Sequence, residues 1–381
     1  MRTLFVTGAT GFVGAALTLE LLRAHPRDRA LCLVRGADGD RRLSQALRAA
    51  AAAYDVPEAA AEDAIGRAGA VAGDVTTAGL GLGAEGRAAL AGRSPLHVFH
   101  VAASLKDSDD AMAEIFDHNI AGTERVLDAL AGTDVAAFNY VSTAYVAGSR
   151  IGAIAESLAA PPAFNNRYEE SKHRAEELVV ARCSAAGVPW RLLRPAIVVG
   201  HSRTGRATGH TGFLGWVQKL AALHEASGGA LRQKRLRYVA RGDARLNVIP
   251  IDSIVEDTLA IDAAGAATLG RVFHLTNREA PEVGWLIETI AGALRIVAPE
   301  VVGPDAELDS LSRRFHKWTR FERSYVHATR DFARDGDALY ASPRQGRVPL
   351  DADLVRRMVV GAVADFARSR GAADATATAA S

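Results

Sequence analysis

Residues 7–14 read Thr7-Gly8-Ala9-Thr10-Gly11-Phe12-Val13-Gly14, with a glycine at every third position. The apolar run Thr3–Thr7 leads into this stretch and predicts a buried strand, and Val13–Ala24 has apolar residues at helical spacing. In a strand–turn–helix unit, the first glycine permits the tight turn, the second lets the backbone approach a pyrophosphate, and the third lets the helix pack closely on the strand. A turn without a ligand is the alternative, but this position favours a dinucleotide site formed by Gly8, Thr10, Gly11, Phe12, Val13 and Gly14.

Short apolar runs alternate with helical patterns along most of the chain. Within each run, apolar and polar residues do not alternate, as expected for parallel strands covered by helices on both faces. The order strand, helix, strand requires right-handed crossovers and predicts an α/β fold with a doubly wound, Rossmann-like parallel sheet. Ligands of such a sheet bind beyond the carboxyl ends of its strands. After the first strand, the predicted strands are Ala30–Val34, Ala70–Ala72, Leu96–Val101, Ala137–Ser142, Trp190–Arg194 and Val272–Thr276.

The regular alternation weakens after Gly200, which predicts a second, smaller and mainly helical domain. We expect residues 1–200 and 246–277 to form the nucleotide-binding domain. Residues 201–245 and 278–370 are expected to form a C-terminal substrate-binding cap. Residues 371–381 read GAADATATAAS and have almost nothing to bury, so they predict a disordered tail.

Composition excludes several classes of protein. Of the 381 residues, 49% are hydrophobic and 23% are charged, which is typical of a globular chain. The net charge of +1 gives no general attraction to nucleic acid, and no apolar run reaches the ~18 residues of a membrane span. Cys32 and Cys183 are the only cysteines, too few for a disulfide scaffold or a structural zinc site, and we expect no metal. Met1-Arg2 runs straight into a strand without a signal-peptide pattern, so a cytoplasmic location is expected.

The residue after the second predicted strand indicates which dinucleotide binds. Arg35 stands where an NAD enzyme usually has an acidic residue that bonds the ribose 2′-OH. A cation at this position suits the 2′-phosphate of NADP(H) instead, and Arg42 on the next helix offers a second cationic contact. An exposed charge without a specific role is the alternative for both arginines.

The ends of the third and fourth predicted strands offer further cofactor contacts. Asp74 can bond the adenine amino group while Val75 packs on the ring, although an Asx turn explains Asp74 equally well. His100-Val-Ala-Ala closes the fourth strand. The small side chains of Ala102 and Ala103 would let a cofactor lie flat against the backbone.

A phenol and an ammonium group follow the fifth predicted strand. In Tyr168-Glu-Glu-Ser-Lys172, Tyr168 and Lys172 share one face of a helix. A neighbouring ammonium favours the phenolate and lowers the phenol pKa from its usual ~10, which suits proton exchange. Thr143 lies 25 residues before Tyr168, and alternation along the extended segment favours it over Ser142 as the hydroxyl that faces the cofactor. A turn motif at the strand end is the alternative for Thr143.

These motifs together resemble the extended short-chain dehydrogenase/reductases over residues 3–277. Within that superfamily the chain is most similar to the carrier-protein thioester reductases and the fatty acyl-CoA reductases. The resemblance implies that Thr143, Tyr168 and Lys172 are catalytic, that Arg35 holds the 2′-phosphate, and that Pro195, Ala196 and Val198 line the nicotinamide site. His201 and the C-terminal third depart from the family pattern and leave the substrate open. The motifs are the glycine triplet, Gly73-Asp74, His100-x-Ala-Ala103, Asn119-x-x-Gly-Thr123, Ser142-Thr143, Tyr168-x₃-Lys172 and Arg194-Pro-x-x-Val-x-Gly200.

The activity implied by the resemblance is an NADPH-dependent reduction of an acyl thioester, bound to CoA or to an acyl carrier protein, or of the derived aldehyde. The basic clusters 232–237 and 313–323 could dock CoA phosphates or an acidic carrier protein, although a solvated helix face explains them as well. An alcohol dehydrogenase or epimerase of the same superfamily, acting on a sugar nucleotide or sterol, is the second hypothesis. A non-catalytic NADP-responsive binding protein is the third.

Overall fold

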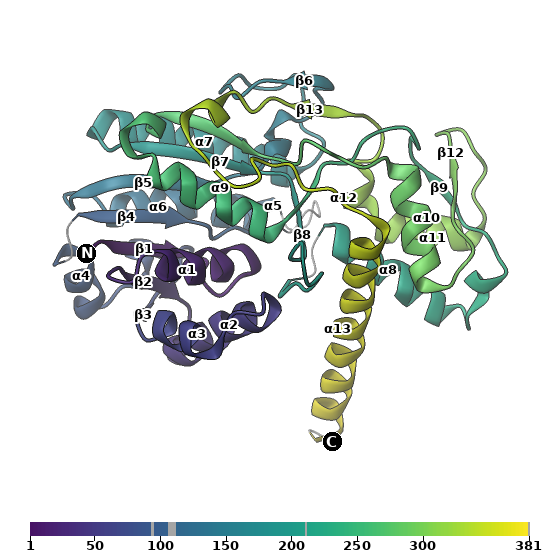
Figure 1. Cartoon of the computed structure of the whole chain (residues 1–381), viewed down its shortest axis with the longest axis horizontal. Coiled ribbons are helices and arrows are strands. Elements are labelled where there is room, and N and C mark those ends of the chain that lie inside the picture. The colour runs from purple at the N-terminus through teal and green to yellow at the C-terminus, as the bar shows by residue number, and fades with distance from the viewer. Residues whose placement is uncertain (93–94, 106–111, 210–211, 380–381) are drawn as a thin grey trace. The chain divides into compact units, whose positions relative to one another are not determined.

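The computed structural model describes residues 1–92, 95–105, 112–209 and 212–379, with the backbone alone for 369–379. Its main feature is a seven-stranded sheet with the strand order β11-β7-β5-β4-β1-β2-β3 (Figure 1). Every pair of neighbours in this sheet is parallel, which confirms the predicted doubly wound fold. The strands are β1 (Thr3–Thr7), β2 (Arg29–Val34), β3 (Ala68–Ala72), β4 (Leu96–His100), β5 (Val135–Val141), β7 (Trp190–Pro195) and β11 (Arg271–Leu275).

Two groups of helices cover the sheet. The first group packs around α1, and the second around α6 and α7. Between the sheet and the second group lies a core of buried apolar side chains that includes Phe5, Val98, Phe138 and Leu192. The helices are α1 (Phe12–Ala24), α2 (Gly39–Ala53), α3 (Glu58–Ile65), α4 (Ala84–Ala91), α5 (Met112–Phe116), α6 (Gly122–Ala129), α7 (Arg167–Ala186) and α9 (Ile251–Ala263), with a π-helical turn at Asp117–Ala121.

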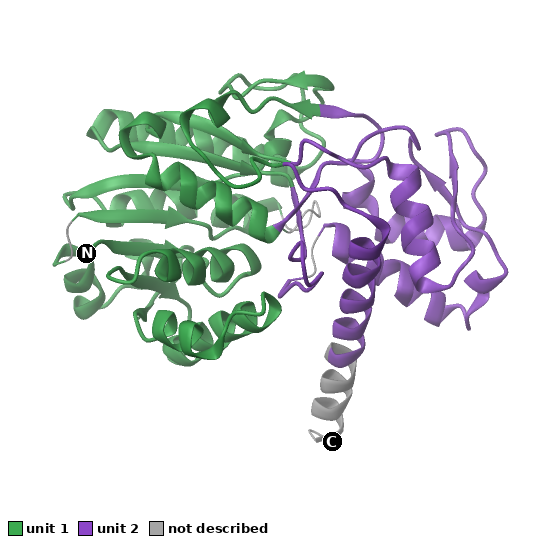
Figure 2. Cartoon of the chain, in the orientation of Figure 1, with its two compact units in different colours: residues 1–196, 251–276, 331–346 green, residues 197–250, 277–330, 347–381 purple. Residues whose placement is uncertain are grey.

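The chain forms two compact units, coloured separately in Figure 2. Unit 1 contains the large sheet and comprises residues 1–196, 251–276 and 331–346. The boundaries differ from the predicted ones at three places. The first segment of unit 1 ends at residue 196 rather than 200, and the second covers residues 251–276 rather than 246–277. Unit 1 also includes residues 331–346, which the sequence assigned to the cap. A small sheet pairs β6 (Gly152–Ile154) with β13 (Arg330–Phe332).

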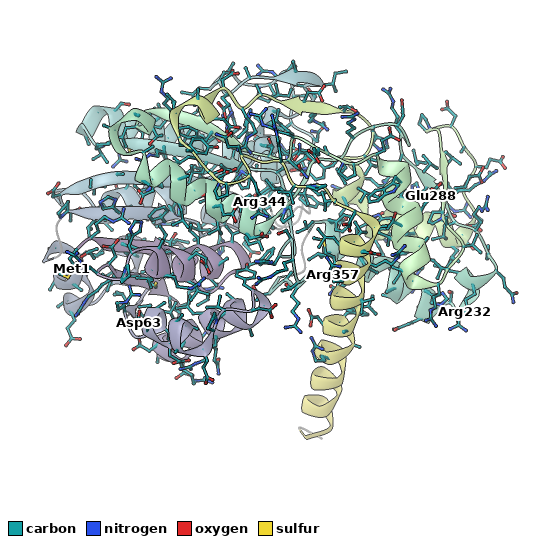
Figure 3. All side chains as sticks on the ribbon, in the orientation of Figure 1. Met1, Asp63, Arg232, Glu288, Arg344 and Arg357 are labelled. Atoms are coloured by element: carbon teal, nitrogen blue, oxygen red, sulfur yellow. The ribbon has the colours of Figure 1, made fainter. Side chains whose placement is uncertain are left out.

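Ion pairs explain why residues 331–346 belong to unit 1. The buried guanidinium of Arg334 lies 2.7 Å from Asp257 of α9. Arg344, labelled in Figure 3, lies 2.7 Å from Asp252 on the same helix. Contacts of this kind leave no apolar periodicity in the sequence, so the pattern of residues 331–346 did not reveal them.

Unit 2 is mainly helical, as expected for the cap. Its aromatic core joins Trp216, Tyr238 and Phe315, and the indole N–H of Trp216 donates to the Tyr238 hydroxyl over 3.0 Å. Two short parallel pairs of strands complete it, β8 with β10 and β9 with β12. The elements are β8 (Ile197–Val199), α8 (Phe213–Ala226), β9 (Arg237–Val239), β10 (Val248–Pro250), α10 (Val283–Leu294), β12 (Glu300–Val302), α11 (Ser310–Trp318), α12 (Arg320–Arg323) and α13 (Ala352–Ala379).

The long helix α13 packs against α8 and α10 at its start. It continues to Ala379, whereas the sequence predicted a disordered tail from residue 371. The difference arises because alanine is a strong helix former even where a segment has little apolar surface to bury. The last two residues, 380 and 381, lie outside the described part of the chain. No helix in the described ranges is both long and apolar enough to cross a bilayer.

Candidate active site

The glycine-rich turn lies between β1 and α1, and two of its glycines are sterically required. Gly8 has a φ of +74°, and a Cβ atom there would lie 2.7 Å from the backbone nitrogen of Ala102. A Cβ atom at Gly14 would lie 2.1 Å from the carbonyl oxygen of Gly8. Gly11 differs, because its added Cβ would approach the Gly8 oxygen at 3.3 Å and no other heavy atom within 4 Å in the described chain.

The start of α1 therefore has free space beside Gly11, of the kind that suits a pyrophosphate. Gly11 is the N-cap residue of the helix and provides no side-chain cap. The first N–H groups of α1 and the partial positive charge of the helix end then remain available for an anion. Thr10, Phe12 and Val13 complete the turn as predicted from the sequence, and their individual contacts with a cofactor stay predictions.

Two arginines lie near the carboxyl end of β2. Arg35 directly follows the strand and is exposed. Arg42, on the first turns of α2, donates from its guanidinium to the Arg35 carbonyl oxygen over 2.6 Å. The carboxylate of Asp38 pairs with Arg41. The described residues at this strand end therefore carry a surplus of positive charge, and a contact of Arg35 or Arg42 with a 2′-phosphate stays a prediction.

Asp74 and Val75 follow β3. The Asp74 carboxylate accepts hydrogen bonds from the backbone N–H and the hydroxyl of Thr76, both at 2.9 Å. This is the Asx turn that the sequence offered as the alternative explanation. Val75 is buried in the apolar core of unit 1, and its contact with an adenine ring stays a prediction together with that of Asp74.

A buried histidine at the end of β4 connects the glycine-rich turn with the helical layer. His100 pairs in register with Thr7 of β1, and the Thr7 hydroxyl lies 2.6 Å from its Nδ1. Its Nε2 lies 2.9 Å from the hydroxyl of Thr123, which itself donates to the Asn119 carbonyl. The Thr7 hydroxyl also accepts the Ala102 N–H. Burial, followed by the charge of Lys172, lowers the His100 pKa to about 3, so the ring is neutral and donates from Nε2.

Sequence reasoning missed Thr7 and Thr123 as partners of His100. The available signal was a histidine at a strand end beside a threonine at the end of the neighbouring strand. Ala102 and Ala103 follow His100; Ala102 is half-buried and Ala103 is exposed. Their contact with a cofactor stays a prediction.

Thr143 and Ser142 follow β5. The Thr143 hydroxyl accepts the Tyr145 N–H at 3.2 Å and donates to the Pro195 carbonyl over a long 3.4 Å. It thereby caps the 3-10 turn Ala144–Ala147. The hydroxyl of Ser142 is buried and has no hydrogen-bond partner among the described residues. Thr143 therefore has a weakly held hydroxyl at the carboxyl edge of the sheet.

Helix α7 presents Tyr168 and Lys172 one turn apart. Asn166 fixes the start of the helix by accepting the Glu169 N–H at 2.9 Å. The ammonium of Lys172 donates to the Val141 carbonyl over 2.8 Å, two residues before Thr143. Because α7 also packs against the 3-10 turn that follows Thr143, the structure brings all three predicted catalytic residues to one corner of unit 1.

Burial controls the electrostatics of this corner. It raises the pKa of Tyr168, with Glu169 as a second cause. Burial also lowers the pKa of Lys172 to about 7, although the Glu176 carboxylate opposes this effect. Glu176 is itself neutralised by Arg194, whose guanidinium donates to both carboxylate oxygens at 2.8 and 2.6 Å.

Asn119 has a structural place in the same corner. Its amide group donates to the Ser171 hydroxyl at 2.8 Å and to the Ser104 carbonyl at 3.0 Å, and its oxygen accepts the Ser104 N–H. Asn119 therefore connects the segment after β4 with α7.

The predicted nicotinamide wall follows β7. Pro195 accepts the Thr143 hydroxyl, and the Ala196 N–H donates to the Leu275 carbonyl of β11 over 3.0 Å. Val198 lies in β8 of unit 2, where it pairs with Ile249 of β10. The role of these three residues toward a nicotinamide stays a prediction. No group of three or more potential metal ligands occurs among the described residues.

The parallel sheet, the glycine-rich turn and the Tyr168–Lys172 pair define an NAD(P)-binding domain of the extended short-chain dehydrogenase/reductase class. The chain belongs to the family described as Male sterility protein, whose model matches residues 6–258.

Two curated relatives match this chain over only part of their own length. A nonribosomal peptide synthetase of Aspergillus hancockii, hkm10, is 28% identical over 73% of this chain and 27% of its own length. A protein of Drosophila melanogaster named fatty acyl-CoA reductase CG8303 is 27% identical over 68% of this chain and 51% of its own length. The chain thus spans about a quarter of the length of the first of these relatives and about half of the second.

Solved structures share the fold. The terminal R domain from the myxalamid PKS-NRPS biosynthetic pathway has a TM-score of 0.75 and 24% identity, over 96% of this chain and 91% of that domain. UDP-glucuronic acid 4-epimerase from Bacillus cereus in complex with NAD has a TM-score of 0.66 and 16% identity, over 96% of this chain and all of that one. At these identities the likeness establishes the common fold.

Proposed function

We propose that this chain is an NADPH-dependent reductase of an acyl thioester, carried by CoA or by a carrier protein, or of the derived aldehyde. The observation that supports this most is the position of Lys172. Its ammonium bonds the end of β5 two residues before Thr143 and lies one helical turn from Tyr168. The Male sterility protein family, with a fatty acyl-CoA reductase among the relatives, supports the same reaction class.

The cofactor would be held by the chain's two anion-binding features. The glycine-rich turn with Gly8, Gly11 and Gly14 suits the pyrophosphate, and Arg35 with Arg42 suits a 2′-phosphate. NADPH, when bound, supplies the hydride. Arg35 argues against the epimerase hypothesis, because NAD-binding members of the superfamily usually have an acidic residue at this strand end.

In the proposed reaction, two hydroxyl groups bind the carbonyl oxygen of the substrate. Thr143 can redirect its proton from the long bond to Pro195 toward this oxygen. Tyr168 donates a second hydrogen bond, so the two groups stabilise the negative charge that develops on the oxygen. Burial raises the pKa of the Tyr168 phenol. The ammonium of Lys172, one helical turn away, acts in the opposite direction because a nearby positive charge favours the phenolate.

Hydride adds to the carbonyl carbon and Tyr168 gives its proton to the oxygen, which forms a hemithioacetal. The C–S bond then breaks as the hydroxyl returns its proton to Tyr168 and the carbonyl of the aldehyde forms. A thiol has a pKa of ~8.5, so the thiolate leaves without a strong acid.

A panel of substrates tests the proposal. Purified protein is incubated with NADPH and, separately, acyl-CoA thioesters, carrier-bound thioesters, aldehydes and ketones, and the products are identified. We expect NADPH oxidation with a thioester and formation of an aldehyde or alcohol. Protein that is purified with tightly bound NAD, and that oxidises NADPH with none of these compounds, would support the epimerase hypothesis instead.

A further inference from the structure

The ring of Tyr140 lies directly beneath the ammonium of Lys172. The Lys172 Nζ is 4.1 Å from the centroid of this ring, and both side chains are fully or almost fully buried. Tyr140 belongs to β5, and Lys172 belongs to α7, 32 residues later. A desolvated cation over an aromatic face is attracted by the negative charge of the ring face.

The Tyr140 ring also packs against the ring of His100. The His100 ring lies 5.5 Å from it, centroid to centroid, at an angle of 44°. His100 is fixed in turn by its hydrogen bonds to Thr7 and Thr123. The Tyr140 ring is therefore packed between Lys172 and a histidine whose own position is fixed by hydrogen bonds.

We propose that Tyr140 is a positioning residue for the reduction: its ring face holds the Lys172 ammonium beside Tyr168 and keeps it protonated. The catalytic part of this inference rests on the proposed function. The contact itself does not, because it concerns the free protein.

The charges around Lys172 show why the ring matters. Glu176 on α7 favours the ammonium, but Arg194 of β7 neutralises this carboxylate through two hydrogen bonds. His100 of β4 is neutral because its pKa is lowered to about 3, and Tyr168 of α7 is neutral because its pKa is raised. Neither residue therefore contributes a negative charge that would stabilise the ammonium. Burial brings the Lys172 pKa to about 7, so a modest loss of stabilisation would deprotonate it near neutral pH. The Tyr140 ring supplies stabilisation of this size.

A double-mutant cycle tests the contact without any assay of activity. Tyr140→Leu, Lys172→Met and the double variant are unfolded in urea at pH 6, where Lys172 is charged, and at pH 10, where it is neutral. We expect the two substitutions to be coupled by about tenfold in the folding equilibrium constant at pH 6, and the coupling to disappear at pH 10. Coupling of equal size at both pH values would show that the interaction does not depend on the charge of Lys172, and it would overturn the proposal.

Matched variants separate the charge effect from the loss of core volume. Phe138→Leu is the control, because Phe138 is buried on the same strand and its ring centroid lies 6.2 Å from that of His100. No contact between Phe138 and Lys172 is seen among the described residues. The cycle of Phe138→Leu with Lys172→Met should show no pH-dependent coupling. Tyr140→Phe keeps the ring and should restore the coupling. Tyr140→Met takes the place of Tyr140→Leu if the leucine variant does not fold.

The catalytic part is tested by the pH dependence of kcat/KM and of NADPH binding. Without the ring, Lys172 loses its proton at lower pH, so the high-pH limb of both profiles should move down by about one pH unit in Tyr140→Leu but not in Phe138→Leu. If the double-mutant cycle shows pH-dependent coupling but the pH profiles of Tyr140→Leu do not shift, the contact exists and the positioning role is overturned. If the wild-type protein reduces no substrate at all, the proposed function fails, while the coupling still decides the contact.

Discussion

The ammonium of Lys172 donates a 2.8 Å hydrogen bond to the carbonyl of Val141, which ties α7 to the last residue of β5. This bond fixes the rotation of the helix relative to the sheet edge at the point where the chain turns toward Thr143. Tyr168 lies one turn earlier on the same helix, so its phenol shares this corner. The geometry of the corner is therefore set by backbone and buried side chains, before any ligand binds.

Tyr168→Phe should lower kcat by ~10²-fold or more, because the variant loses the proton donor of the proposed reaction and keeps the ring. NADPH affinity should persist, since the glycine-rich turn and Arg35 are unchanged. Steady-state kinetics and NADPH fluorescence measure the two effects. Tyr54→Phe, which removes the hydroxyl of a buried tyrosine directly after α2, is the control and should leave kcat unchanged. Full activity in the Tyr168 variant would remove this residue from the mechanism.

Arg35→Asp should weaken NADPH binding far more than NADH binding, because the new carboxylate repels a 2′-phosphate and can bond a 2′-hydroxyl. The ratio of the two dissociation constants is the measurement. Arg41→Asp makes the same change of charge on the neighbouring helix, at a residue that pairs with Asp38. Equal losses for both cofactors, or the same ratio in the two variants, would mean that Arg35 does not touch the 2′-phosphate.

Gly14→Ala should destabilise the protein by several kcal/mol and abolish cofactor binding. The added methyl group would lie 2.1 Å from the Gly8 carbonyl, so the helix would have to move away from the turn that holds the pyrophosphate. Gly292 of α10 is the matched control, since a Cβ there meets no heavy atom of the described chain within 4 Å. Gly292→Ala should stabilise by about 0.5–1 kcal/mol. Urea unfolding compares the two, and similar small effects would contradict the packing argument.

The fold followed from local patterns in the sequence. Each of the seven predicted strands matches an observed strand of the sheet to within two residues at either end, and Thr3–Thr7 matches β1 completely. Apolar runs and the glycine triplet are signals carried by neighbouring residues, so they can be recognised without knowing what packs against them.

Contacts between distant residues could not be predicted in the same way. The Tyr140–Lys172 contact joins residues from different elements, and Glu156 accepts the backbone N–H of Gly336, 180 positions away. Such contacts depend on how strands and helices are placed in space. For the same reason, the sequence identified Thr143, Tyr168 and Lys172 as candidates but not the buried groups that control their protonation.

Lys172→Met should make the protein more stable at pH 6 and progressively less so, relative to wild type, toward pH 10. Burial lowers the Lys172 pKa in the folded chain to about 7, against ~10.4 when the chain is unfolded. Between these values the unfolded state binds more protons than the folded state, so wild-type stability rises with pH. Below pH 7 the folded wild type carries the full cost of the buried charge, which the methionine avoids.

At pH 6 we expect this gain to be on the order of 2 kcal/mol, because the loss of the bond to Val141 offsets part of it. Urea unfolding at pH 6, 8 and 10 provides the measurement. Lys219→Met is the control, since Lys219 is partly exposed and pairs with Glu322, and its difference from wild type should not shrink in the same way. A difference that is the same at all three pH values for Lys172→Met would show that the ammonium keeps its ordinary pKa, and the electrostatic account of the site would then be wrong.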